Sequence, residues 1–176
     1  MPRDSRQMSS ETHPSGDCRV GIGYDSHRFA PGRPLILGGV RIESEVGLTG
    51  HSDADAVCHA ITDAVLGAAG LGDIGDMFPD SDPSNKDRDS VVMLGAAVER
   101  IAASGYVVRN VDVTVIAESP RVGPHREQMR ERLSEVLGVA SSAVSIKGKT
   151  NEGMGWIGRR EGLACIAVAT LVRSRA

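Results

Sequence analysis

Residues 51–70, HSDADAVCHAITDAVLGAAG, carry the strongest structural signal in this sequence, because their apolar side chains recur with the period of a helix. The positions that fit this period are Ala56, Val57, Ala60, Ile61, Ala64, Val65 and Ala68. Ser52 or Asp53 is suited to cap the start of the helix, and the glycine-rich run that follows is suited to end it. We therefore predict a helix here that packs against the rest of the domain.

The segments on either side of this helix predict strands and two further helices. Strands are predicted over residues 18–25, 107–117, 142–150 and 162–172, and a hairpin with a Gly38–Gly39 turn over residues 33–44. Helices are predicted from Asp89 or Ser90 to about Ser104, and over residues 125–138 with Gly138 as the C-cap. Residues 76–87, DMFPDSDPSNKD, predict a long polar loop. Together these elements predict an α/β (α+β) fold, a two-layer sandwich with helices on one face of a mixed sheet.

The 176 residues are enough for one domain, which we place at residues 18–176 after a disordered N-terminal tail at residues 1–17. The tail has neither an apolar segment nor the arginine pattern of a targeting sequence. A net charge of −3 argues against a partner that is a nucleic acid. Three cysteines without CxxC spacing and the lack of a long apolar run predict a cytoplasmic protein that is not inserted in a membrane.

The segment GYDSHRF, residues 23–29, places a carboxylate and an imidazole two residues apart near the end of a strand. Asp25 and His27 therefore point to the same side and could bind one ion together, although a simple ion pair at the strand end fits the same spacing. His59 could supply a third ligand, with Asp55 and Asp63 one helical turn away on either side to hold its other ring nitrogen. Such a set suits zinc with one coordination position open, and a histidine that merely satisfies a helix face remains the alternative.

Four segments, in this order and spacing, closely resemble the 2-C-methyl-D-erythritol 2,4-cyclodiphosphate synthase family of the non-mevalonate isoprenoid pathway. They are GYDSHRF, LGGV at residues 37–40, GLTGHSDADAVCHAITDAVLGAAGLGDIGDMFPDSDP at residues 47–83 and KTNEGMGWIGRREGLACIAVATL at residues 149–171. The resemblance covers residues 19–172. It implies a homotrimer with shared active sites, a phosphorus–oxygen lyase that converts 4-diphosphocytidyl-2-C-methyl-D-erythritol 2-phosphate to 2-C-methyl-D-erythritol 2,4-cyclodiphosphate and CMP.

The resemblance also implies a role for individual residues. Zinc or another divalent transition metal would be bound by Asp25, His27 and His59, and Mg²⁺ or Mn²⁺ by Glu152, while His51 and Thr150 would stabilise the transition state. The residues that would contact the substrate are Asp25, Ser26, His27, His51, Ser52, Asp73, Ile74, Gly75, Phe78, Pro79, Asp80, Ser81, Asp82, Ala117, Glu118, Ser119, Pro120, Arg121, Val122, Gly123, Gly148, Lys149, Thr150, Asn151, Glu152, Trp156 and Arg159. Charge stabilisation suits this reaction, because three phosphoryl groups that repel one another must meet.

The sequence departs from the family pattern at a few positions. Lys149 and Asn151 flank Thr150 where the family usually has a run of threonines, and Trp156 replaces a usual phenylalanine. Arg159 and Glu161 match residues that line the threefold axis, where an isoprenoid diphosphate is sometimes found. Arg160 stands nearby where glycine is common, and it would change the charge of that cavity.

Two other functions are compatible with a three-ligand site. A zinc phosphoesterase would use metal-bound hydroxide and would not need a cytidine pocket. A trimeric binding protein without chemistry would not need two metals. Glu152 and the cytidine-side segments at residues 117–123 and 148–152 are therefore the features that separate these functions from the cyclisation.

Overall fold

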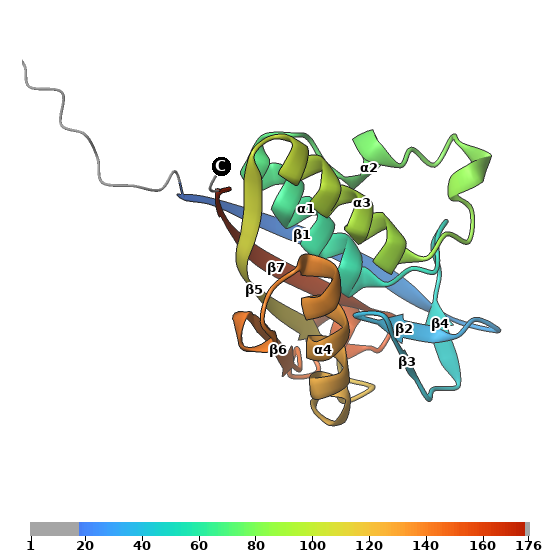
Figure 1. The fold of residues 1–176 in the computed structure, drawn as a ribbon. Helices are drawn as coiled ribbons and strands as arrows, with labels where there is room; N and C mark the ends of the chain where they lie inside the picture. The colour runs from blue at the N-terminus through green and yellow to red at the C-terminus, as the bar shows by residue number, and fades with distance from the viewer. Residues whose placement is uncertain (1–17, 175–176) are drawn as a thin grey trace, which may run out of the picture.

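The computed structural model describes residues 18–174, and Figure 1 shows the arrangement of their helices and strands. The strands are β1 Cys18–Pro31, β2 Leu35–Leu37, β3 Val40–Ile42, β4 Val46–Leu48, β5 Tyr106–Ile116, β6 Val144–Lys149 and β7 Gly162–Arg173. The α-helices are α1 Ala56–Ala69, α2 Ile74–Met77, α3 Ser90–Ala103, α4 Arg126–Leu137 and α5 Gly155–Gly158. Short 3₁₀ turns lie at η1 Pro83–Asn85, η2 Gly123–His125 and η3 Ser141–Ala143. The predicted tail at residues 1–17 lies outside the described residues.

Five strands form one mixed sheet in the order β4-β1-β7-β5-β6. Only β5 and β6 run parallel, and every other neighbouring pair is antiparallel. The register of β1 on β7 places Asp25 opposite Cys165 and His27 opposite Leu163. The predicted hairpin is confirmed as a separate pair of strands, β2 and β3, with Leu37 opposite Val40.

The long helices lie on one side of the sheet, as predicted, and α1 packs directly on β1 and β7 (Figure 1). Gly21 and Gly23 of β1 make this close packing possible. A Cβ atom at Gly21 would overlap the carbonyl oxygen of Ala64, and one at Gly23 would overlap that of Ala60. The backbones of β1 and α1 therefore touch without intervening side chains, and this contact sets the distance between Asp25 on the strand and His59 on the helix.

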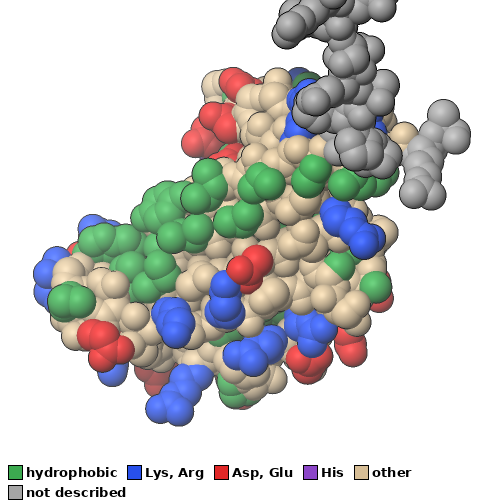
Figure 2. Space-filling view, turned by 90° about the vertical axis from the view of Figure 1, so that its left-hand side faces the viewer, with side chains coloured by type: hydrophobic (Ala, Val, Ile, Leu, Met, Phe, Trp, Pro, Cys, Tyr) green, Lys and Arg blue, Asp and Glu red, His purple; other side chains and the backbone are tan. Residues whose placement is uncertain are grey.

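The other side of the sheet is open in the single chain. Val20, Ile22 and Tyr24 alternate with the two glycines along β1, and all three are more than half exposed. Val168 of β7 lies opposite Ile22 and is also exposed. Hydrophobic side chains gather in a band on one side of the molecule (Figure 2). Apolar surface of this kind is typical of a region that contacts another chain.

Two local predictions need correction. The N-cap of α1 is Asp55, neither Ser52 nor Asp53, because its carboxylate accepts hydrogen bonds from the backbone N–H groups of Val57 and Cys58. Ser52 and Asp53 instead accept bonds from Ala54 and Asp55 in the turn that precedes the helix. The loop predicted over residues 76–87 overlaps the end of α2 and contains η1, since aspartate side chains cap both elements.

Within residues 18–174, no helix is long and apolar enough to cross a membrane.

Candidate metal centre and functional site

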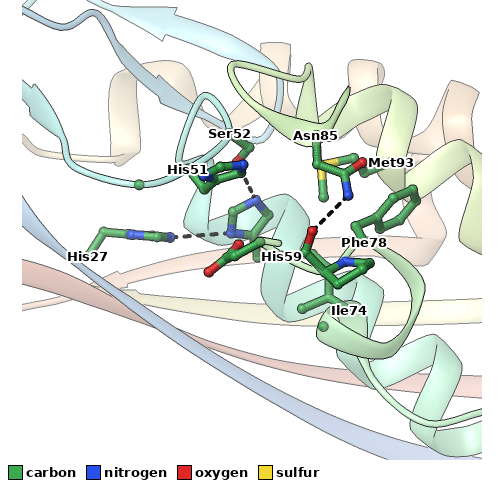
Figure 3. Close-up of a pocket in the computed structure, with 12 residues that line it drawn as sticks. His27, His51, Ser52, His59, Ile74, Phe78, Asn85 and Met93 are labelled. Carbon is green, nitrogen blue, oxygen red and sulfur yellow. Dashed lines mark hydrogen bonds between the residues drawn. The ribbon is translucent and has the colours of Figure 1, made fainter. Parts of the chain in front are cut away.

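Asp25, His27 and His59 converge as the sequence predicts. Nε2 of His27 lies 2.9 Å from Oδ2 of Asp25, and Nδ1 of His59 lies 3.1 Å from the same oxygen. The two ring nitrogens are 3.3 Å apart, and Figure 3 shows the two imidazoles facing each other at the edge of a pocket. Three potential ligand atoms, one from each residue, thus lie within 4.8 Å of one another.

The outer nitrogen of each imidazole has its own partner. Nδ1 of His27 donates to the carbonyl oxygen of Thr49 at 2.7 Å, which leaves the lone pair of Nε2 directed into the cluster. Nε2 of His59 lies 3.0 Å from the hydroxyl of Ser52 and 2.8 Å from that of Ser90. Partners of this kind orient metal-binding histidines in many proteins.

The prediction that Asp55 or Asp63 holds His59 is wrong. Both carboxylates are engaged by backbone N–H groups, Asp55 as the cap of α1 and Asp63 as the acceptor for Ile74 at 2.8 Å. Residues one turn away on a helix lie on the same face, but the ring of His59 points toward β1 and α3. The hydroxyls of Ser52 and Ser90 therefore replace the expected carboxylates.

The carboxylate of Asp25 supplies negative charge to the cluster. Burial alone would raise the pKa of Asp25, but hydrogen bonds and charge interactions with His27 and His59 outweigh burial and hold this pKa well below its usual value. Burial would likewise lower the pKa of His27, and the hydrogen bond and negative charge of Asp25 raise it instead. One carboxylate and two imidazole nitrogens facing a common point are a ligand set that fits zinc or a similar divalent metal.

This cluster opens into a cavity of about 510 Å³ (Figure 3). The cavity is lined by His27, Gly50, His51, Ser52, His59, Ile74, Gly75, Phe78, Pro79, Asp80, Asn85 and Met93. It therefore brings together two of the three predicted metal ligands, His27 and His59, with the predicted substrate contacts His51, Ser52, Ile74, Gly75, Phe78, Pro79 and Asp80. Five predicted contacts from this part of the chain are not among its lining residues: Asp25, Ser26, Asp73, Ser81 and Asp82. Asp73 and Asp82 instead cap α2 and η1.

His51 is a polar group without a partner in this cavity. Its Nε2 atom is buried and makes no hydrogen bond to any described residue. A buried polar atom of this kind is costly unless a ligand or water satisfies it. Its place beside the predicted metal ligands fits the predicted contact with substrate.

A second cavity, of about 590 Å³, collects the predicted cytidine-side segments. Its lining includes Ala117, Glu118, Pro120, Arg121, Val122, Gly123, Gly148, Lys149 and Thr150, and it shares no residue with the first cavity. Oε1 of Glu118 accepts hydrogen bonds from the N–H groups of Asn151 at 2.9 Å and Gly153 at 3.1 Å. Glu118 therefore fastens the loop that carries Glu152.

The remaining predicted residues lie near these cavities. The hydroxyl of Thr150 donates to Glu152 at 2.5 Å, and Glu152 adopts a left-handed backbone with φ of 51°. Trp156 lines a smaller cavity with Ser26 and His27. Arg159 and Glu161 form an ion pair of 2.7 Å on the surface of the single chain. Ser119 is absent from the lining of the described cavities and precedes a cis peptide bond to Pro120.

Sequence reasoning missed four residues of this site. Gly50, Asn85 and Met93 line the first cavity, and Ser90 contacts His59. Ser90 was expected only as a possible helix cap, and its polarity at the start of α3 gave no sign of its contact with α1. Asn85 donates to the carbonyl oxygen of Pro79, which closes the loop over the cavity (Figure 3).

Comparison with known proteins finds extensive similarity. Residues 18–172 match the model of the YgbB family. A 2-C-methyl-D-erythritol 2,4-cyclodiphosphate synthase of Gemmatimonas aurantiaca is 65% identical over 154 residues, which cover 88% of this chain and 93% of that protein. The synthase of the same name from Bordetella avium is 56% identical over 155 residues, 88% of this chain and 96% of that protein.

Several solved structures are also similar to this chain. The bifunctional IspDF from Campylobacter jejuni superposes with a TM-score of 0.88 at 38% identity, over 92% of this chain but only 44% of that longer protein. A 2C-methyl-D-erythritol-2,4-cyclodiphosphate synthase in a CDP-bound form has a TM-score of 0.80 at 39% identity, over 87% of this chain and 99% of that one. The CDP complex of IspF from Plasmodium falciparum has a TM-score of 0.79 at 36% identity, over 90% of this chain and 97% of that one.

Proposed function

This chain belongs to the YgbB family, and from that membership we propose that it is a 2-C-methyl-D-erythritol 2,4-cyclodiphosphate synthase. The substrate would be 4-diphosphocytidyl-2-C-methyl-D-erythritol 2-phosphate. An oxygen of the 2-phosphate attacks the β-phosphorus, the bond from that phosphorus to the bridging oxygen breaks, and CMP leaves with that oxygen. The observation that carries the proposal is the convergence of Asp25, His27 and His59 at the edge of a cavity that also contains His51 and Ser52.

The family resemblance implies two cation sites, and the cluster of Asp25, His27 and His59 supports the first of them. Asp25, His27 and His59 would hold zinc, and Glu152 would hold magnesium or manganese, since hard cations prefer one or two carboxylates together with phosphate oxygens. The bound cations supply positive charge that lets the phosphoryl groups approach each other. The residues of the chain must orient the two phosphates and stabilise the charge that develops between them.

His51 and Ser52 are suited to bind the phosphates on the side of the first cavity. The unpartnered Nε2 of His51 would donate to a phosphate oxygen when it carries a proton. On the other side, the hydroxyl of Thr150 is 2.5 Å from Glu152, so it can turn from this carboxylate to a developing oxyanion. Cytosine would be read in the second cavity, whose lining includes Glu118, Arg121 and Gly148 from the two cytidine-side segments.

We further propose that the active site is shared between chains of a homotrimer. The two cavities share no lining residue, which supports a site that a second chain completes. The exposed apolar side chains Val20, Ile22 and Tyr24 on the open face of the sheet provide a surface that an assembly would bury.

The test is incubation of the purified protein with the diphosphocytidyl substrate, Zn²⁺ and Mg²⁺, with the products identified by phosphorus NMR. The proposal predicts equal amounts of CMP and the cyclic diphosphate. A linear phosphate product would identify a phosphoesterase, and unchanged substrate would identify a binding protein. The variant His59→Ala should lose both bound zinc and turnover, whereas His125→Ala, at the start of α4, should keep both.

A further inference from the structure

We propose that Ser90 and Asp53 are positioning residues that fix the ring of His59 in the tautomer needed to bind the metal. Neither residue belongs to the predicted ligand set or to the lining of the first cavity. The inference rests on the proposed metal site, and it adds the reason why His59 presents Nδ1 as a ligand.

The contacts form a chain that leads from a carboxylate to the imidazole. The hydroxyl of Ser90 donates to Oδ1 of Asp53 in a very short hydrogen bond. The same hydroxyl oxygen lies 2.8 Å from Nε2 of His59. Ser90 is fully buried, at 0% exposure, so water does not compete for these contacts.

The direction of the hydrogen bonds follows from counting protons. A serine hydroxyl has one proton to donate, and Ser90 gives it to the carboxylate of Asp53. Its oxygen can then only accept from His59, so Nε2 of His59 must carry a proton. In the neutral ring, Nδ1 is left with a lone pair, and Nδ1 is the atom that faces Asp25 and His27.

Asp53 is held so that it cannot reverse this direction. Its Oδ1 also accepts from the N–H of Asp55 at 3.2 Å, and its Oδ2 accepts from the N–H of Ser90 at 3.1 Å. Both oxygens must therefore be acceptors. The amide of an asparagine at position 53 would point an N–H group at Ser90 or Asp55, which are themselves donors here. Ser52 also contacts Nε2 of His59, but it lines the cavity and is a predicted phosphate ligand, so Ser90 is the residue that can be changed without altering the substrate pocket.

Two variants with matched controls test the proposal. Ser90→Ala removes the hydroxyl, and Ser134→Ala removes a similarly buried hydroxyl from α4 that bonds only the carbonyl of Glu131. Asp53→Asn changes the carboxylate. Asp89→Asn makes the same change at the neighbouring cap of α3, where the carboxylate accepts a hydrogen bond from the N–H of Val91. Zn²⁺ affinity is measured by competition with a chromophoric chelator, and the tautomer of His59 is read by nitrogen-15 NMR of the metal-free protein.

The expected result is an Nε2-protonated His59 in the unchanged protein. Ser90→Ala and Asp53→Asn should weaken Zn²⁺ binding by about 10- to 100-fold and should populate the other tautomer, while both controls retain the original affinity and tautomer. Because the affinity and the tautomer are both measured, a simple loss of stability is separated from a loss of positioning. If Ser90→Ala does not fold, Asp53→Asn decides the question.

The outcomes separate this inference from the proposed function. Zn²⁺ affinity within about threefold of the original in the folded variants, or an Nδ1-protonated His59 in the unchanged protein, would overturn the positioning role even if the enzyme makes the cyclic product. Normal Zn²⁺ binding that depends on Ser90, without any cyclic product, would overturn the proposed function and leave the positioning role intact. A protein that binds no Zn²⁺ would overturn both.

Discussion

The carboxylate of Asp55 accepts a hydrogen bond of 2.6 Å from the backbone N–H of Gly39, which joins the start of α1 to the turn of the β2–β3 hairpin. The same fully buried carboxylate also accepts from Gly38 and from two N–H groups of α1. One side chain thus satisfies four backbone donors in two elements. Hydrogen bonds to a charged group are stronger than those between neutral groups.

We expect Asp55→Ala to lower the free energy of unfolding by about 3–5 kcal/mol, since the cap of α1 and the hairpin anchor are lost together and buried N–H groups are left unpaired. Chemical denaturation measures this change. Asp73→Ala is the control, because Asp73 caps the short helix α2 and accepts a single N–H bond, from Asp76, at an exposed position. An equal loss of unfolding free energy in the two variants would show that the hydrogen bonds from Gly38 and Gly39 to Asp55 do not stabilise the protein.

The contact of β1 with α1 leads to a second prediction. Gly23→Ala should destabilise the protein by more than about 2 kcal/mol and weaken metal binding, because the new methyl group would push Ala60 and the adjacent His59 away from β1. Gly67→Ala is the matched control on the exposed side of α1, where a Cβ atom would meet no neighbour. This control should gain about 0.5–1 kcal/mol from the better helix propensity of alanine. Thermal unfolding and zinc titration distinguish the two; a normal zinc affinity for Gly23→Ala would contradict the packing argument.

A shared active site predicts rescue between two inactive variants. His59→Ala removes a metal ligand from the first cavity, and Glu152→Ala removes the carboxylate beside the second. After dissociation and reassembly as mixed trimers, some interfaces would combine an intact first cavity from one chain with an intact second cavity from another. Cyclic product should then appear, although each variant alone is nearly inactive.

The composition of the mixed trimers must be established by native mass spectrometry, with one variant isotopically labelled. The control mixes chains that all carry the His59→Ala change. No interface then has an intact first cavity, so this mixture should remain inactive. No rescue in trimers shown to be mixed would place the whole site within one chain.

Arg160 provides a prediction about stability alone. It adopts φ of 59°, a left-handed backbone that disfavours residues with a side chain. Arg160→Gly should therefore raise the free energy of unfolding by up to about 1 kcal/mol. Arg159→Gly, at φ of −81°, should not stabilise the protein, because its backbone is already in a favourable region. A gain of equal size in both variants would exclude backbone strain as the cause.

Much of the fold could be predicted because local signals and burial agree. The spacing of Ala60, Ile61 and Ala64 gave α1, and the Gly38–Gly39 turn gave the hairpin. The cap of α1 was misplaced because Ser52, Asp53 and Asp55 are all good caps, and only the contact of Asp55 with the distant hairpin decides among them. Local chemistry could not supply this long-range contact.

The candidate site was predicted unevenly for a similar reason. Asp25 and His27 follow from a strand period of two, and His59 from its place on the helix one turn from Asp55 and Asp63. The partners of His59 did not follow, because Ser90 lies 31 residues further along the chain and reaches His59 only when α3 packs on α1. The pairing of the two cavities in an assembly stays a prediction.

Gly21 and Gly23 of β1 also determine which amino-acid substitutions the site can tolerate during evolution. Since main-chain atoms of β1 and α1 are in direct contact, no side chain lies between them at Gly21 and Gly23 whose size could set the spacing of these two elements. Substitutions of core side chains elsewhere therefore have less influence on the positions of the three predicted ligand atoms. Lineages that diverge widely in their packing residues can keep the same ligand geometry, provided that residues 21 and 23 remain without a side chain.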